Sequence, residues 1–128
     1  MKKLFLIGLM LLTGSAWAEW TLFFTGSETG TRDYIDYQTI KKNGNLRQSW
    51  QIKENESKDF SRYGQSTRIK STIDCSKEMI QYLYISFHKE LMGKGQIIAQ
   101  FDYSNDNDWR SIPPQTVSAA LFNIVCAK

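Results

Sequence analysis

The feature that most constrains this chain is the stretch Ile73 to Leu91, in which Cys75 precedes the longest strand-like run of the sequence. The other cysteine of the chain is Cys126, near its C-terminus. In an exported protein, two cysteines most simply form one disulfide. We therefore expect a disulfide between Cys75 and Cys126, which would join the middle of the chain to its end.

The first 18 residues have the pattern of a secretory signal peptide. A short region with two lysines is followed by the apolar run 4–12 and by Ala16-Trp17-Ala18, a small-x-small cleavage site. We expect cleavage between Ala18 and Glu19. The apolar run is far shorter than the roughly 20 residues that span a bilayer, so a membrane span is not expected.

A lipid anchor is not expected either. In a bacterial lipoprotein, Leu12-Thr13-Gly14 would precede a cysteine that carries the lipid, but the next residue here is Ser15. A serine hydroxyl cannot form the thioether. The sequence predicts a soluble exported protein, either periplasmic or secreted.

The length of the remaining chain, residues 19–128, allows one ordinary domain with one core. Its charge bears on the kind of partner. Removing Lys2 and Lys3 from the 16 basic residues leaves 14 against 13 acidic residues, a net charge near +1. Such a balance gives no electrostatic support for a nucleic-acid partner.

Strand patterns alternate with turn signals along most of this domain. Six runs are expected to be strands: 20–24, 32–42, 46–53, 66–75, 79–91 and 96–103. Asn43-Gly44, between the second and third runs, predicts a tight hairpin. After Pro113-Pro114, Thr116 can cap a helix in which apolar residues recur with helical spacing over 117–125. The predicted fold is α+β, an antiparallel sheet of about six strands with one C-terminal helix packed on it.

The run 79–91 is apolar on both faces if it alternates without interruption. One face would carry Met79, Leu83, Ile85, Phe87 and Leu91, and the other Ile80, Tyr82, Tyr84 and His88. Such a strand is usually central, with a helix over one face and aromatic residues, loops or a second subunit over the other. A homodimer is therefore one of the options. At the chain end, Cys126 lies on the far side of the helical wheel from Val117, so either the helix ends before it or that flank also packs.

Several segments taken together resemble the surface-adhesin protein E family of exported bacterial proteins. They are Tyr34-Ile35-Asp36, Thr39-Ile40, Trp50, Asp74-Cys75 with the aromatic run after it, the WRSIP segment 109–113, and Ile124-Val125-Cys126. The resemblance covers nearly the whole of residues 19–128. It implies a non-enzymatic domain with the same sheet, helix and disulfide, whose namesake is similar to an adhesin for host proteins such as vitronectin and laminin.

Catalytic and metal-binding constellations are not apparent in the sequence. His88, Tyr82 and Tyr84 could in principle ligate haem iron, but an ordinary packed histidine is the simpler interpretation. The run DYSNDND at 102–108 lacks the glycine and terminal glutamate of an EF-hand loop and is read as a solvated turn. We expect no catalytic residue, no metal ligand and no cofactor.

A basic segment with one aromatic residue is the best candidate for a binding surface, because tyrosine and arginine concentrate binding energy at interfaces. Its candidate ligand-binding residues are Arg62, Tyr63, Arg68 and Lys70, together with Lys58. In the namesake, the matching loop is associated with ligand binding. The leading hypothesis is adhesion to host matrix or serum proteins, and the alternative is a periplasmic structural or inhibitory protein that binds a bacterial partner.

Overall fold

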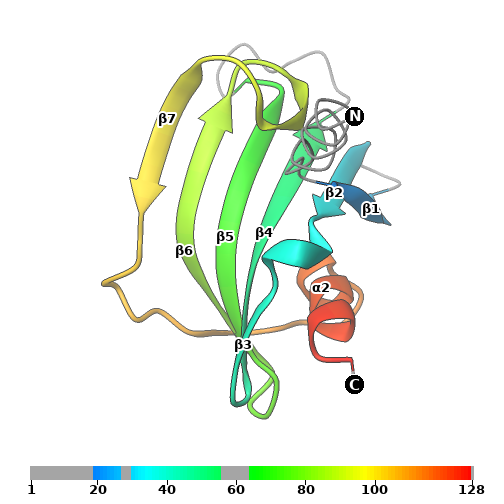
Figure 1. Cartoon of the computed structure of the whole chain (residues 1–128), viewed down its shortest axis with the longest axis vertical. Helices are drawn as coiled ribbons and strands as arrows, with labels where there is room; N and C mark the ends of the chain where they lie inside the picture. Colours follow the sequence, from blue (N-terminus) through cyan, green and yellow to red (C-terminus); the bar gives the residue numbers. More distant parts are fainter. Residues whose placement is uncertain (1–18, 27–29, 56–63, 128) are drawn as a thin grey trace, which may run out of the picture.

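The computed structural model describes residues 19–26, 30–55 and 64–127, which form one curved sheet with a helix against it (Figure 1). The strands are β1 (Thr21–Thr25), β2 (Thr31–Ile35), β3 (Lys41–Asn43), β4 (Leu46–Asn55), β5 (Ser66–Asp74), β6 (Met79–His88), β7 (Ile97–Asp102) and β8 (Arg110–Ser111). Two 3₁₀ turns, η1 (Tyr37–Thr39) and η2 (Leu91–Gly93), and the helix α2 (Val117–Val125) complete the described elements.

The main path of the sheet is β1-β2-β4-β5-β6-β7, and β3 and β8 extend it beside β4 and β6. All seven strand pairs within the described ranges are antiparallel. The predicted α+β fold, an antiparallel sheet with one C-terminal helix, is confirmed. β7 forms one edge of the path, on the opposite side of the molecule from α2 in the view of Figure 1.

Side chains that alternate along the strands give the sheet two faces. We call the face that bears Ile35 and Ile73 the helix face, because both residues share a buried cluster with Leu121 and Val125 of α2. We call the other face, which bears Trp50 and its cross-strand partner Lys70, the tryptophan face.

The helix α2 begins where the sequence predicts. The Oγ1 atom of Thr116 accepts a hydrogen bond from the Ala119 N–H at 3.2 Å, which satisfies one of the free donors of the first turn. Leu121 and Val125 are fully buried against Ile73 and Ile80, so burial of one apolar stripe holds the helix on the sheet.

The disulfide between Cys75 and Cys126 is present, with the two Cα atoms 5.7 Å apart. Cys126 is the C-cap of α2, so the helix ends just before it. The flanking Phe122 also packs on the core, and thus both of the alternatives left open for this end of the helix contribute. The bond ties the C-terminus to the turn that joins β5 and β6.

The predicted run 32–42 is not one strand. A 3₁₀ turn divides it into β2 and β3 because Asp36 caps that turn: its Oδ1 atom accepts a hydrogen bond from the Gln38 N–H at 3.0 Å. The hydroxyl of Thr39 also donates to the Asp36 carbonyl at 2.7 Å. A short polar side chain thus offered the backbone a local alternative to the sheet.

The hairpin between β3 and β4 is present, one residue away from the predicted turn. Asn43 pairs with Leu46, so the two turn residues are Gly44 and Asn45 rather than Asn43 and Gly44. Gly44 has φ +60°, which a residue with a Cβ rarely adopts, and it stands at the first turn position, as type II′ hairpins require.

The alternation predicted for 79–91 is wrong. Lys70 pairs with Tyr84 and Ser71 pairs with Tyr82, so Leu83 is the extra residue of a β-bulge. Because of the bulge, Ile80 and Tyr82 lie on the helix face, whereas Tyr84 lies on the tryptophan face. The residues after Tyr84 alternate between the two faces in step with it. The strand also ends at His88, and Leu91 belongs to the turn η2.

Candidate functional site

Four neighbouring strands place one row of side chains across the tryptophan face. Trp50 of β4 pairs with Lys70 of β5, Lys70 with Tyr84 of β6, and Tyr84 with Asp102 at the end of β7. The bulge at Leu83 is what brings Tyr84 into this row. An aromatic ring, a cation, a second ring and a carboxylate therefore lie side by side on the sheet.

Two cations flank the indole ring of Trp50. The Arg68 guanidinium carbon lies 5.1 Å from the ring centroid and the Lys70 Nζ atom 5.7 Å from it. Both distances are within the range of cation–π attraction, which is worth about 0.5–1 kcal/mol at exposed sites. Tyr84 meets the same indole edge-on, with the ring centroids 5.9 Å apart. These contacts hold the two basic side chains in place on the sheet surface.

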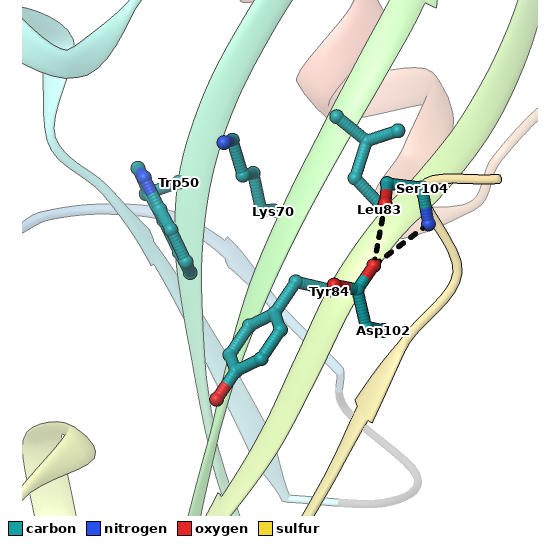
Figure 2. Close-up of a pocket in the computed structure, with 6 residues that line it drawn as sticks. All are labelled: Trp50, Lys70, Leu83, Tyr84, Asp102 and Ser104. Atoms are coloured by element: carbon teal, nitrogen blue, oxygen red, sulfur yellow. Dashed lines mark hydrogen bonds between the residues drawn. The ribbon is translucent and has the colours of Figure 1, made fainter.

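A hollow of about 280 Å³ opens beside this row (Figure 2). Its lining comes from Trp50, Lys70, Leu83, Tyr84, Asp102 and Ser104. The Tyr84 hydroxyl points along the sheet and donates to Oε1 of Gln100 at 2.5 Å. The lining of the hollow thus combines two aromatic rings, Trp50 and Tyr84, with a basic group, Lys70, and an acidic group, Asp102.

Asp102 is a fixed negative charge at the rim of the hollow. Its Oδ1 atom accepts hydrogen bonds from the Ser104 hydroxyl at 2.6 Å and from the Ser104 N–H at 2.9 Å. These hydrogen bonds, with a smaller effect of the Lys70 charge, lower the pKa of Asp102 below 3.8. The row therefore carries both signs of charge at neutral pH.

The turn η2 covers the tryptophan face beyond this row. The Met92 N–H donates to Glu54 at 3.0 Å, and the Gly93 N–H donates to the Ser66 hydroxyl at 2.9 Å. Gly93 has φ +66°, and a Cβ atom there would lie 2.9 Å from the Arg68 side chain. Glycine is thus required both for the turn and for the close packing of η2 on Arg68.

His88 is buried under this covered end. Its Nε2 atom lies 2.8 Å from the Ser86 hydroxyl, and the residue is only 5% exposed. Tyr82 is on the helix face, where its hydroxyl lies 3.3 Å from that of Ser118, so it does not share a face with His88. Of the two tyrosines considered with His88 for haem iron, only Tyr84 shares its face, and the burial of His88 fits the ordinary packed histidine that the sequence favours.

Lowering the pH from about 7.5 to about 5.5 should lower the free energy of unfolding through His88. Burial lowers the pKa of His88 from 6.5 and the Arg68 charge lowers it further, while a backbone hydrogen bond with Gly95 acts in the opposite direction. Because the unfolded chain binds this proton more tightly, the stabilisation is fully present above pH 6.5 and is lost as the pH falls toward the folded-state pKa. Urea unfolding of wild type and His88→Gln at both pH values measures it. A pH dependence equal in the two proteins would contradict this role of His88.

The candidate ligand-binding residues divide into two groups. Arg68 and Lys70 lie on one face of β5, as the alternation of that strand predicts, and both contact the same indole. Arg62, Tyr63 and Lys58 lie outside the described residues. The sequence reasoning missed Trp50, Tyr84 and Asp102 as site residues, because pairing between strands, and not a signal within one segment, brings them together.

Titratable side chains elsewhere do not converge on a reaction centre in the described part of the chain. Asp33 is buried on the helix face, where burial raises its pKa despite the Lys53 charge and the hydrogen bond from Gln51. His88 lies on the other face. Within the described ranges, no three side chains of histidine, cysteine, aspartate or glutamate are placed to hold a metal ion. The acidic run near the end of β7 serves local turns, with Asp108 paired to Arg110 at 3.0 Å.

No helix in the described ranges has both the length and the apolar character needed to cross a membrane.

Comparison with known proteins gives one family and one fold. Residues 20–127 match the model of the family described as surface-adhesin protein E. Two solved structures of Haemophilus influenzae protein E are similar to this chain, with TM-scores of 0.62 and 0.60 at 16% and 17% sequence identity. The first similarity covers 88% of this chain and 89% of that one, and the second 88% and 87%. No curated protein matches the sequence. The chain therefore belongs to the surface-adhesin protein E family, and it shares the fold of the Haemophilus influenzae protein over nearly its whole length.

Proposed function

We propose that this protein is an exported, non-enzymatic adhesin that binds host matrix or serum proteins, of which vitronectin and laminin are the first to test. The family is one of surface adhesins, which supports export and a protein ligand. The observation that carries the proposal is the pair Arg68 and Lys70, both held against Trp50, with Trp50 and Lys70 lining an open hollow.

This part of the sheet has the chemistry of a protein-binding surface. Interfaces concentrate their energy in aromatic residues and arginine at the centre of the contact, with polar residues around them. Trp50 and Tyr84 supply rings that are already ordered by each other and by the cations, so little conformational freedom is lost on binding. The surface lies on the face opposite α2, which leaves the core undisturbed when a ligand binds.

We further propose that residues 1–18 are a signal peptide removed between Ala18 and Glu19, and that residues 19–128 form the adhesin domain. Ser15 in place of a cysteine supports a protein that is not lipid-anchored. Mass spectrometry of the exported protein tests the cleavage site. Fractionation tests the destination, since protein held only in the periplasm would favour the alternative, a bacterial partner met inside the envelope.

The double variant Arg68→Ala/Lys70→Ala should weaken binding to immobilised vitronectin or laminin by about tenfold or more, because it removes two ordered cations from the centre of the proposed surface. The pair Arg62→Ala/Tyr63→Ala should weaken the same binding. Equilibrium binding of residues 19–128 at physiological salt is the measurement.

The matched control is Lys41→Ala/Lys42→Ala, which removes the same number of charges from the exposed strand β3. Lys70→Glu is a second variant that leaves Arg68 and its packing against η2 intact. If the Arg68 and Lys70 variants bind as tightly as the β3 control, this surface is not the binding site. If wild type binds neither protein, these host ligands are wrong.

A further inference from the structure

The outer edge of β7 has unusually few features that would prevent another strand from pairing with it. β7 ends the main path of the sheet, and among the described strands only β6 pairs with it. Natural sheets protect such an edge with lysine, proline or a covering segment. Residues 97–101 contain neither a charge nor a proline, and Ile97, Ile98 and Phe101 are 47%, 44% and 47% exposed.

No other strand in residues 19–26, 30–55 and 64–127 pairs with the outer side of β7, so the outward backbone groups of this edge are available at definable positions. The Tyr103 N–H donates to the Leu83 carbonyl of β6 at 2.8 Å. Since N–H groups of a strand point alternately to its two sides, the N–H of Phe101 also points to β6. The N–H groups of Gln100 and Asp102 then point away from the sheet, toward the place that an added strand would occupy.

The side chains around this edge specify what could pair with it. On the tryptophan face, Asp102 ends the row that begins at Trp50, and its charge would face the next strand. On the helix face, Phe101 stacks with Tyr103 at 6.2 Å and meets Phe87 edge-on at 6.2 Å. A strand beside β7 would therefore place a basic residue opposite Asp102 and an apolar residue beside Phe101.

We propose that the edge of β7 binds an extended segment of the protein ligand by strand addition, and that this segment alternates basic and apolar residues. This inference rests on the proposed adhesin function, because the added strand would continue the row of Trp50, Lys70, Tyr84 and Asp102. Main-chain hydrogen bonds supply affinity in this mode, and alternate side chains supply selectivity.

A second copy of this chain fits the edge less well. Antiparallel pairing of two β7 strands about their centre would set Asp102 of each copy beside the Ile97 end of the other, where no described basic residue of the strand faces it. A segment of another protein with a basic residue at that position would pair with the Asp102 carboxylate. Self-association is accordingly an outcome that the experiment must separate from peptide binding.

The test uses the whole domain, residues 19–128, and a synthetic peptide about seven residues long that alternates lysine and valine. Hydrogen exchange should show new protection at the amides of Gln100 and Asp102 when the peptide is added. Sedimentation should show no dimer of the domain under the same conditions. Protection that appears without peptide as the protein concentration rises would instead identify a second copy as the occupant, and would overturn the proposal.

The decisive variants are Gln100→Pro and its matched control Gln100→Ala. Both lose the hydrogen bond from Tyr84, but only proline removes the outward N–H and places a ring at the edge, where strands tolerate it. We expect peptide affinity to fall by about tenfold in the proline variant and by less than about twofold in the alanine variant. Equal loss in both overturns strand addition.

A charge exchange keeps the proposal testable even if Gln100→Pro folds poorly. Wild type should bind the lysine–valine peptide about fivefold more tightly than a glutamate–valine peptide, and Asp102→Lys should reverse the order. An unchanged order overturns the pairing with Asp102. Loss of vitronectin binding in the Arg68 and Lys70 variants but not in Gln100→Pro would reject this inference alone, and the adhesin function would stand.

Discussion

Replacing both Cys75 and Cys126 with serine should lower the free energy of unfolding by about 4 kcal/mol. The two residues are separated by 51 positions, and closing a loop of that length removes much of the conformational entropy of the unfolded chain. The loss is a large fraction of the 5–15 kcal/mol or so that ordinary domains possess. Urea unfolding of the oxidised wild type and the double variant measures it.

Reduction of the wild type provides the control for this prediction, because it removes the bond without changing a side chain's size. The reduced protein and the double variant should have similar midpoints, both well below that of the oxidised protein. A double variant as stable as the oxidised wild type would contradict the structural importance of this bond for the attachment of α2.

Replacing Leu121 with alanine should destabilise the domain by about 3 kcal/mol, within the range of about 2–5 kcal/mol for a buried leucine. Leu121 is 1% exposed and lies in the cluster of Ile35, Ile73, Ile80 and Val125, so the substitution leaves a cavity between α2 and the sheet. The substitution removes a contact on which the helix depends, and it acts on the same attachment as the disulfide.

Leu22→Ala is the matched control, because it makes the same leucine-to-alanine change at a surface position: Leu22 of β1 is 49% exposed. This variant should lower the free energy of unfolding by well under about 1 kcal/mol. Both variants are compared with wild type by urea unfolding in the oxidised state. Equal costs at the two positions would show that α2 is not packed through Leu121 as described.

The C-terminal helix could be predicted from sequence because its signals are local. Pro113-Pro114 interrupts regular structure, Thr116 caps the first turn, and the apolar residues after it follow the helical period. Each of these acts within a few residues, and the structure contains all of them. The disulfide was equally predictable from sequence, since only one pairing is possible in an exported chain with two cysteines.

The two faces of β6 could not be predicted, because the bulge at Leu83 depends on the partner strand. Nothing within 79–91 marks where pairing with β5 shifts by one residue, yet that shift moves Ile80 and Tyr84 to opposite faces. The division of 32–42 by η1 is different. Asp36 carried a local signal for a turn, which the strand propensity of its neighbours obscured.

The candidate site was predictable only in part. Arg68 and Lys70 share a face of one strand, which their spacing reveals. Their contact with Trp50 depends on the register between β4 and β5, and Asp102 reaches the same row from the far edge of the sheet. Residues brought together by pairing between strands leave no pattern in any single segment.

The central claim is that a protein ligand binds the tryptophan face of this domain and leaves the helix face free. Hydrogen exchange and indole chemical shifts of residues 19–128, recorded with and without saturating vitronectin, test it most directly. We predict changes at the Trp50 indole and at the amides around Arg68 and Lys70, with those of α2 unchanged. Changes confined to α2 and the strands beneath it, with Trp50 unaffected, would contradict the claim.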